Sequence, residues 1–387
     1  MRKTIRRLAA WACCLCMAAG AVTAAWAQET DYAQMEWELV EAQRQQLTDG
    51  EPLLTRQDVL PAGQSSVADW YAIAMVRCGI SEDYETYLAA LKTYVESAYA
   101  ENGGLSANKA TEWHRVALAV TALGGDAAAF GTKPDGTTVD LIADGCYDCV
   151  VEGGPGAQGL NGWIFALLAL DAGGYQAPEG ARYTRETIIE AIVSAQGEDG
   201  GFSLTGDALD ADITAMALQA LAPYADGQAE VIDRALAALS AAQCADGGFA
   251  SWGAENAEST AQVVMALCAL GIDPAADERF CKEGGSAVTA LLGFRMEDGS
   301  FAHVGGTSDA MASEQGLQAL EALRRFYAGE KRFFDMTDAG APVQWTADSA
   351  AAEETAGVPA AVYMAAGAAV VVAAGIVIVR KGRGSHE

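Results

Sequence analysis

Residues 198–202 read Glu198-Asp199-Gly200-Gly201-Phe202. The same acid-Gly-Gly-aromatic turn recurs as Ala245-Asp246-Gly247-Gly248-Phe249 and as Glu297-Asp298-Gly299-Ser300-Phe301, with weaker copies at 102–105 and 152–154. The second small residue of these copies falls at positions 104, 154, 201, 248 and 300, so successive copies are 50, 47, 47 and 52 residues apart. A near-constant period of this length is typical of stacked or closed arrays of helical repeats.

Each turn lies between two different helical patterns. The segment before it is amphipathic, as over 188–193, whereas the segment after it is Ala-rich and apolar nearly all round, as over 212–221 and 259–267. A helix that is apolar on all sides is buried on all sides. Glycine supplies the positive φ that ends a helix and reverses the chain. Each period therefore predicts an outer helix, a tight turn and an enclosed inner helix.

Six such hairpins are predicted. Six hairpins can close as an all-α (α/α)6 toroid, with the inner helices forming a barrel. An open solenoid is the alternative, and it would need polar capping repeats, which are not evident in the sequence. Inner helices are expected near 67–79, 112–124, 160–173, 212–222, 259–271 and 312–327, and their outer partners near 30–47, 85–100, 137–149, 184–196, 228–243 and 277–295.

The N-terminus is typical of a secretory signal peptide. Four basic residues lie within the first seven, an apolar run extends from Leu8 to Trp26, and Ala25-Trp26-Ala27 supplies a small-x-small cleavage pattern. We expect a signal peptide over 1–27 that is cleaved after Ala27. An uncleaved anchor is the alternative, because the apolar run is long.

The C-terminus predicts a single transmembrane helix. Residues 359–379 carry no charge and are long enough to cross a hydrocarbon core of about 30 Å. Basic residues follow at once within the tail, 380–387, and such residues stay on the cytoplasmic side. We expect an extracellular domain over 28–335, a linker over 336–358, and a single-pass protein of the cell membrane. A buried core helix is the alternative for 359–379.

The charge distribution excludes one class of partner. The chain has 24 Lys and Arg against 52 Asp and Glu. Seven of the basic residues and one of the acidic ones lie in the predicted signal and tail, which leaves 17 against 51 over 28–358, a net charge of about −34. Such a surface repels nucleic acid, so no nucleic-acid partner is expected. Half of the residues are apolar, which is enough to build a core.

Six cysteines lie outside the predicted signal, at 78, 146, 149, 244, 268 and 281. An even number in an exported chain permits disulfides, but the sequence does not fix their pairing. Cys146-x-x-Cys149 could be half of a zinc site or a redox pair, yet no second CxxC is present. We expect thiols that pack between helices, and no metal site.

The turns Gln196-x-x-Asp199-Gly200-Gly201-Phe202 and Gln243-x-x-Asp246-Gly247-Gly248-Phe249, with the Asp/Ser-Thr-Ala helix starts that follow them, resemble prenyltransferase and squalene-cyclase repeats. These repeats build the α/α-toroids of the terpenoid cyclase and protein prenyltransferase superfamily, as found in bacterial surface proteins. The resemblance covers roughly residues 60 to 327. It implies the fold and leaves the function open, because such toroids serve terpene cyclases, protein prenyltransferases, cobalamin carriers and complement thioester domains.

The motifs of these branches are matched unequally. Class II terpene cyclases use Asp-x-Asp-Asp-Thr-Ala to protonate an alkene; Asp210 and Asp212 match this motif, but Ile213 replaces its last acid. The two acids could instead cap the inner helix at its N-terminus. The zinc ligands of the prenyltransferases and the thioester motif have no counterpart. The carrier branch remains: no cofactor is predicted, a cobalamin-like ligand is the option to test, and a cap on another chain would then be required.

A closed barrel would bring the inner-helix N-termini together at one rim. Positive helix ends, aromatic walls and a few polar groups make a ligand site. The alternative is that these residues cap helices and satisfy buried neighbours. The expected ligand-binding residues are Asp69, Trp70, Glu112, His114, Arg115, Asn161, Trp163, Asp212, Gln262 and Glu314.

Three functions remain open. We favour a membrane-anchored, non-catalytic module that binds a small-molecule or protein ligand outside the cell. The alternative is an enzyme, either a terpenoid cyclase-like isomerase or an acid-pair glycosidase, with Asp210, Asp212 and Glu314 as catalytic candidates. A purely structural spacer is the third, and it predicts a barrel plugged by side chains.

Overall fold

The computed structural model describes residues 32–345, apart from residues 205, 207 and 252. The predicted signal peptide, transmembrane helix and cytoplasmic tail lie outside the described residues. Within the described part, no helix is both long enough and apolar enough to cross a bilayer. Helices dominate its secondary structure, and the named strands are two-residue pairs, so the all-α class is confirmed.

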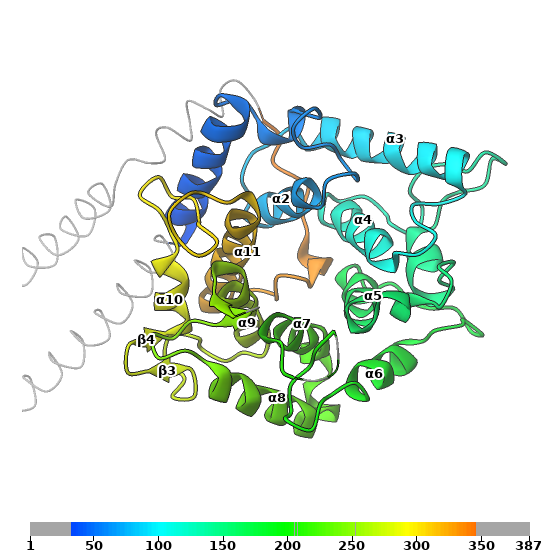
Figure 1. The fold of residues 1–387 in the computed structure, drawn as a ribbon. Helices are drawn as coiled ribbons and strands as arrows, with labels where there is room; N and C mark the ends of the chain where they lie inside the picture. Colours follow the sequence, from blue (N-terminus) through cyan, green and yellow to red (C-terminus); the bar gives the residue numbers. More distant parts are fainter. Residues whose placement is uncertain (1–31, 205, 207, 252, 346–387) are drawn as a thin grey trace, which may run out of the picture. The chain divides into compact units, whose positions relative to one another are not determined.

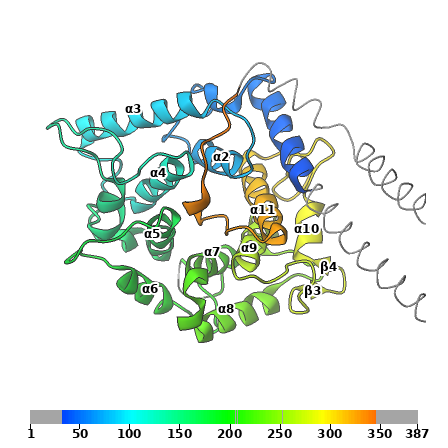
Figure 2. The ribbon, with the colours of Figure 1, turned by 180° about the vertical axis from the view of Figure 1, so that it is seen from behind.

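Six Ala-rich helices form an inner ring. Each contacts the next along the chain, and the last also contacts the first, so the contacts run in a closed cycle (Figure 1, and from behind in Figure 2). Every bound lies within two residues of the sequence-based expectation. The helices are α2 Ser66–Arg77, α4 Ala110–Ala122, α5 Leu160–Ala172, α7 Ala211–Leu221, α9 Ala257–Ala269 and α11 Ala310–Ala328.

The outer layer is less regular than the inner ring. Its helices are an unlabelled first helix over 32–48, α3 Tyr84–Asn102, α6 Arg185–Val193, α8 Ala229–Ala242 and α10 Ala287–Gly293. Short 3₁₀ turns occur at η1 Leu53–Thr55, η3 Pro155–Gln158, η4 Ala222–Gly227 and η5 Met336–Asp338. The strands pair as two antiparallel hairpins: β1 Ala250–Ser251 with β2 Ala254–Glu255, and β3 Cys281–Lys282 with β4 Gly285–Ser286.

Two of the expected outer helices are wrong in extent. Over 137–149 the chain forms only a short turn that ends in the π-helical stretch η2, Ala143–Tyr147. Gly145 presses on the inner helix there, because a Cβ on it would come 2.7 Å from the Cβ of Trp113. Over 277–295 the β3–β4 hairpin replaces the first half of the helix. Its Gly284 packs on the preceding turn, since a Cβ there would lie 2.8 Å from the carbonyl oxygen of Ala245.

Two separate constraints, a positive φ and a lack of space for a Cβ, require glycine in the recurring turns. The first glycine of each strong copy has a φ of 88° at Gly200, 101° at Gly247 and 97° at Gly299, a region that residues with a Cβ seldom adopt. The next outer segment also leaves no room for a side chain. A Cβ would lie 2.8 Å from Arg234 O, 2.5 Å from Ser286 O and 2.9 Å from Glu38 C in the three copies, respectively.

The residue three positions before each turn aspartate ties the turn to the next outer segment. Gln196 Nε2 donates to the carbonyl oxygen of Val231 in α8 at 2.8 Å, and Gln243 makes the equivalent bond. In the third copy Arg295 takes this place and pairs with Glu38 of the first outer helix. Because the last turn contacts the first outer helix, the outer layer closes in the same sense as the inner ring.

Each turn is also tied to its own inner helix. The turn phenylalanines Phe202, Phe249 and Phe301 are at most 1% exposed. A hydroxyl in the inner helix accepts a hydrogen bond from each backbone N–H, which explains the Thr or Ser near every helix start. The pairs are Phe202 with Thr214 at 2.9 Å, Phe249 with Thr260 at 3.1 Å, and Phe301 with Ser313 at 3.0 Å.

Aromatic side chains pack inside the ring. Trp70 of α2 lies against Phe165 of α5, with ring centroids 5.8 Å apart, although α4 separates these two helices along the ring. Phe334 packs edge-on against Trp70 from the return segment, which we define as residues 329–344 after α11. This segment includes the start of the expected linker and runs back to the beginning of α3, where Gln344 forms a bridge to Glu82.

Candidate functional site

Asp69 and Arg115 form a buried ion pair between α2 and α4. Arg115 Nε donates to Asp69 Oδ2 at 2.8 Å, while the Tyr87 hydroxyl and the Gly63 backbone N–H donate to Asp69 Oδ1 at 2.7 and 2.9 Å. Burial nevertheless raises the pKa of Asp69, outweighing the effect of Arg115. These contacts give the two expected ligand-binding residues partners within the protein.

Most of the other residues expected along α4 and α5 also contact neighbours within the protein. His114 is fully buried, its Nε2 lies 2.8 Å from the Gly145 carbonyl oxygen, and burial lowers its pKa to about 4, so it is neutral at pH 7. Trp163 packs edge-on against Tyr183, with centroids 5.5 Å apart. Glu112 pairs with Lys109 at 3.6 Å, and Asn161 keeps a buried Oδ1 with no hydrogen-bond partner among the described residues.

Acidic side chains gather at the N-terminal ends of α7, α9 and α11. Asp210 caps α7, because its Oδ1 accepts the backbone N–H groups of Asp212 and Ile213. Burial raises the pKa of Asp212 to about 6, with further contributions from Asp210 and Glu258. Oδ1 of Asp212 is buried and has no hydrogen-bond partner among the described residues.

Glu314 of α11 belongs to the same acidic group. It is 2% exposed, and its carboxylate accepts a hydrogen bond from Gln318. Burial raises its pKa well above the ordinary value, and the charge of Glu258 raises it further. Glu258 in turn lies 2.8 Å from Nδ1 of His303. The structure therefore brings Asp212 and Glu314 into the field of Glu258, a residue that the sequence analysis did not include.

A ladder of amides joins three successive inner helices. Gln219 Nε2 of α7 donates to Gln262 Oε1 of α9 at 2.9 Å, and Gln262 Nε2 donates to Gln315 Oε1 of α11 at 3.0 Å. These two hydrogen bonds link the three side-chain amides in a row and fix their orientation. Gln219 connects this ladder to the cavity described next.

A cavity of about 680 Å³ opens at the opposite ends of the helices from the expected rim. Its walls are the C-terminal parts of α5, α7, α9 and α11 together with the return segment. Apolar and aromatic side chains form much of the lining: Leu168, Tyr224, Met265, Phe326, Phe333 and Phe334. None of the ten expected ligand-binding residues lines it, but Gln262 is linked to it through Gln219, and Trp70 through Phe334. A smaller hollow of about 330 Å³ lies beside the turn at 198–203.

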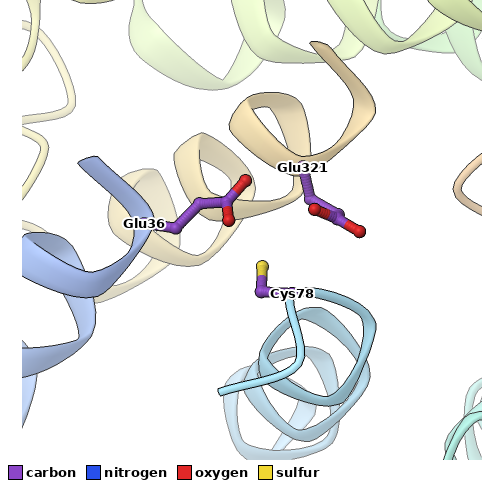
Figure 3. A group of neighbouring side chains, drawn as sticks. All are labelled: Glu36, Cys78 and Glu321. Atoms are coloured by element: carbon purple, nitrogen blue, oxygen red, sulfur yellow. The ribbon is translucent and has the colours of Figure 1, made fainter. Parts of the chain in front are cut away.

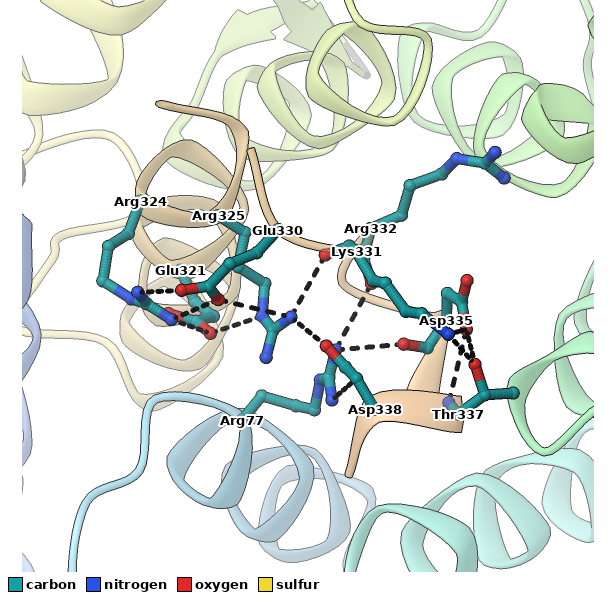
Figure 4. A network of polar contacts seen from close by, with 10 residues as sticks. All are labelled: Arg77, Glu321, Arg324, Arg325, Glu330, Lys331, Arg332, Asp335, Thr337 and Asp338. Carbon is teal, nitrogen blue, oxygen red and sulfur yellow. Dashed lines mark hydrogen bonds and ion pairs between the residues drawn. The ribbon is translucent and has the colours of Figure 1, made fainter. Parts of the chain in front are cut away.

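The charged groups of this cavity are nearly all paired. Asp171 accepts hydrogen bonds from Arg185 and Tyr224, and Glu330 accepts one from Arg324 at 3.1 Å. Arg332 is the exception, because its guanidinium makes no ion pair or hydrogen bond with another described residue, and Figure 4 shows it extending away from the polar network. The cavity thus combines aromatic walls with one available cation.

The return segment is fastened across this end of the ring by two arginines (Figure 4). Arg77 of α2 donates to Asp338 Oδ1 at 2.6 Å and to the carbonyl oxygen of Asp335 at 3.1 Å. Arg325 of α11 donates to Asp338 Oδ2 at 2.8 Å and to the carbonyl oxygen of Lys331 at 3.1 Å. One wall of the cavity therefore depends on an ion-pair network between the first and last inner helices.

The six cysteines outside the predicted signal are all free thiols in the structure, so none of the permitted disulfides is formed. Cys146 and Cys149 are both buried, in keeping with thiols that pack between helices.

No protein-family model matches the chain, and no curated protein sequence matches it. The cavity was missed at the sequence level because about a third of its lining residues come from the return segment, which has no helical period. The run Phe333-Phe334 beside Lys331 and Arg332 was the available signal: aromatic and basic residues in a segment that was expected to be a linker.

Proposed function

We propose that this protein is a membrane-anchored, extracellular α/α-toroid that binds a small molecule in the cavity between its inner helices and the return segment. The closed cycle of helix contacts supports the (α/α)6 toroid, and the signal-like and membrane-spanning patterns at the two ends support the location. The resemblance to prenyltransferase and squalene-cyclase repeats adds support for the fold.

The cavity is the observation that carries the binding role. Ligand sites in proteins typically enclose about 300–1,000 Å³, with mostly apolar walls and a few polar groups, and the cavity of about 680 Å³ falls in this range. The candidate acids lie at the other end of the helices, where Asp210 is occupied as a cap and Glu314 by Gln318. This separation favours binding over catalysis.

The lining also indicates the chemistry of the ligand. Tyr224, Phe326 and Phe333 offer flat apolar surfaces, and Arg332 offers a guanidinium that can pair with a carboxylate. The ligand that fits these groups is a mostly apolar molecule with one acidic or carbonyl group. A highly charged anion fits poorly, because the surrounding domain is strongly acidic.

The test is native mass spectrometry of the full-length protein, released from detergent, to look for a retained small molecule. Ala269 lines the cavity, so Ala269→Trp should obstruct it and weaken retention. Ala237 is exposed on α8, and Ala237→Trp is the matched control that should keep the ligand. Equal retention by both variants would place the ligand elsewhere and refute the proposed site.

A second candidate function rests on Asp212. A buried carboxyl with a pKa of about 6 can donate a proton near neutral pH, as a general acid must. A terpenoid cyclase-like isomerase or an acid-pair glycosidase would use this property together with Glu314. Turnover of an isoprenoid or oligosaccharide substrate by the wild type, and its loss in Asp212→Asn, would favour this second candidate over binding alone.

A further inference from the structure

We propose that Glu36, Cys78 and Glu321 form a binding site for a divalent metal ion, with Zn²⁺ as the best fit, that clamps the ring where its first and last helices meet. The three residues lie far apart in sequence and come from three elements. Glu36 lies in the first outer helix, Cys78 caps the C-terminus of α2, and Glu321 lies in α11. Figure 3 shows their side chains converging on one point.

The ligand atoms are close enough for one ion. The carboxylate oxygens of Glu36 and Glu321 and the sulfur of Cys78 all lie within 4.8 Å of one another. In a tetrahedral zinc site, with bonds of about 2.0 Å to oxygen and about 2.3 Å to sulfur, the ligand atoms are roughly 3.3–3.8 Å apart. The side chains therefore need to move together by about 1 Å or less. A set of one thiolate and two carboxylates suits a borderline ion such as Zn²⁺ better than Mg²⁺ or Ca²⁺.

Glu36 has a buried carboxylate oxygen that makes no hydrogen bond to another described residue. Its side chain is 2% exposed, and its Oε1 is buried without a hydrogen-bond partner among the described residues. An orphaned buried carboxylate oxygen is costly unless the group is protonated or meets a cation. This is a second observation, independent of the clustering, that indicates a missing ligand.

Glu321 can bind an ion without releasing its arginines. It accepts three hydrogen bonds, from Arg325 Nε at 2.6 Å and from Arg324 Nε and Nη2 at 2.7 and 3.0 Å. A carboxylate has about four lone-pair positions, so one remains for a metal.

The net charge of the site is the same with and without a bound divalent metal ion. Burial and the neighbouring Glu321 raise the pKa of Glu36 well above its ordinary value, and burial raises that of Cys78, so without a cation the site favours the protonated form of both groups. A dication that replaces these two protons leaves the net charge unchanged. The remaining groups are three guanidiniums facing three carboxylates, namely Arg77, Arg324 and Arg325 with Glu321, Glu330 and Asp338.

The test titrates the full-length protein with Co²⁺ as a spectroscopic probe and with Zn²⁺ as its competitor. A thiolate bound to Co²⁺ produces a near-ultraviolet charge-transfer band, which a site made only of carboxylates lacks. We expect this band in the wild type, its displacement by Zn²⁺, and its loss in Cys78→Ser. The affinity should rise with pH, because metal binding displaces protons from its ligands.

Matched variants separate this site from other thiols. Cys244→Ser removes the thiol of a half-exposed Cys-Asp-Glu group, and Cys146→Ser removes that of the CxxC pair; both variants should keep the band. Glu36→Gln imitates the protonated acid, so we expect unchanged unfolding without metal and about tenfold or more weaker Zn²⁺ binding. Absence of the band in the wild type at pH 8, or its survival in Cys78→Ser or at full strength in Glu36→Gln, would overturn the proposal. In that case Glu36 and Glu321 act only as a pair of acids that shares a proton.

Discussion

Arg77, the last residue of α2, donates a hydrogen bond of 2.6 Å to Asp338 in the return segment, 261 residues further along the chain. The Arg77 side chain is 3% exposed and the Asp338 side chain 27% exposed, so the pair is largely shielded from water. Arg325 holds the second oxygen of the same carboxylate. This contact joins the first inner helix, the last inner helix and the wall of the cavity.

Arg77→Met should therefore destabilise the protein and release the return segment. Without Arg77, Asp338 keeps only Arg325 and the carbonyl oxygen of Asp335 loses its donor, so we expect a loss of about 2–3 kcal/mol in the free energy of unfolding. Urea denaturation measures the loss, and hydrogen exchange over 330–340 should accelerate. Arg56→Met is the control, because Arg56 and Asp58 form an exposed pair and their separation should have no measurable effect. Equal losses in both variants would contradict this role for Arg77.

The turn glycines allow the cost of a positive φ to be measured separately from the cost of a steric contact. Gly200 and Gly136 have nearly the same φ, 88° and 87°, but a Cβ would meet Arg234 O at 2.8 Å only at Gly200. Substitution by alanine should cost about 1–2 kcal/mol at both sites because of the positive φ. Gly200→Ala should cost at least about 1 kcal/mol more, because the contact between turn and α8 is also strained. Thermal or urea unfolding of the two variants gives the difference, and a difference near zero would remove the packing argument.

These turns explain how far the sequence predicted the fold. The Asp-Gly-Gly-Phe pattern and the Ala-rich runs gave the inner helices to within two residues, because both patterns express burial by the neighbouring repeat. The outer layer was harder. Gly145 and Gly284 break two expected outer helices through close contacts with Trp113 and Ala245, and such contacts leave no periodic signal in the chain.

The candidate site was harder still to predict. Asp69 and Arg115 were both expected to bind a ligand at the rim, but they form an ion pair with each other. The cavity lies at the other ends of the helices because the return segment passes there, and its position depends on contacts such as that of Arg77 with Asp338. No sequence pattern links residues so far apart, and the same is true of Glu36, Cys78 and Glu321.

Asp69 offers a test of structural against ligand-binding roles. Asp69→Ala removes the acceptor of Arg115 Nε and of the Tyr87 hydroxyl and leaves the guanidinium without a counter-charge, and we expect a loss of about 3–5 kcal/mol. Arg115→Ala in the same background should add little, because the pair is already broken. A double-mutant cycle by urea denaturation measures this coupling. Additive losses would mean that the two residues do not act as a pair, and a change in ligand retention without a loss of stability would restore the binding role.

Asp212 predicts a specific dependence of stability on pH. Its pKa is raised to about 6 in the folded protein, against 3.8 for the ordinary carboxyl. Between about pH 4 and pH 6 the folded protein keeps a proton that the unfolded chain releases, so this group makes unfolding easier as the pH rises through that window. Asp212→Asn is neutral at every pH and should remove this contribution. The variant should therefore exceed the wild type in free energy of unfolding by about 3 kcal/mol above pH 6, with the advantage shrinking toward zero below pH 4. Urea denaturation of both proteins from pH 3.5 to pH 7.5 measures the difference directly, and a difference that stays constant across this range would show that Asp212 titrates as an ordinary carboxyl.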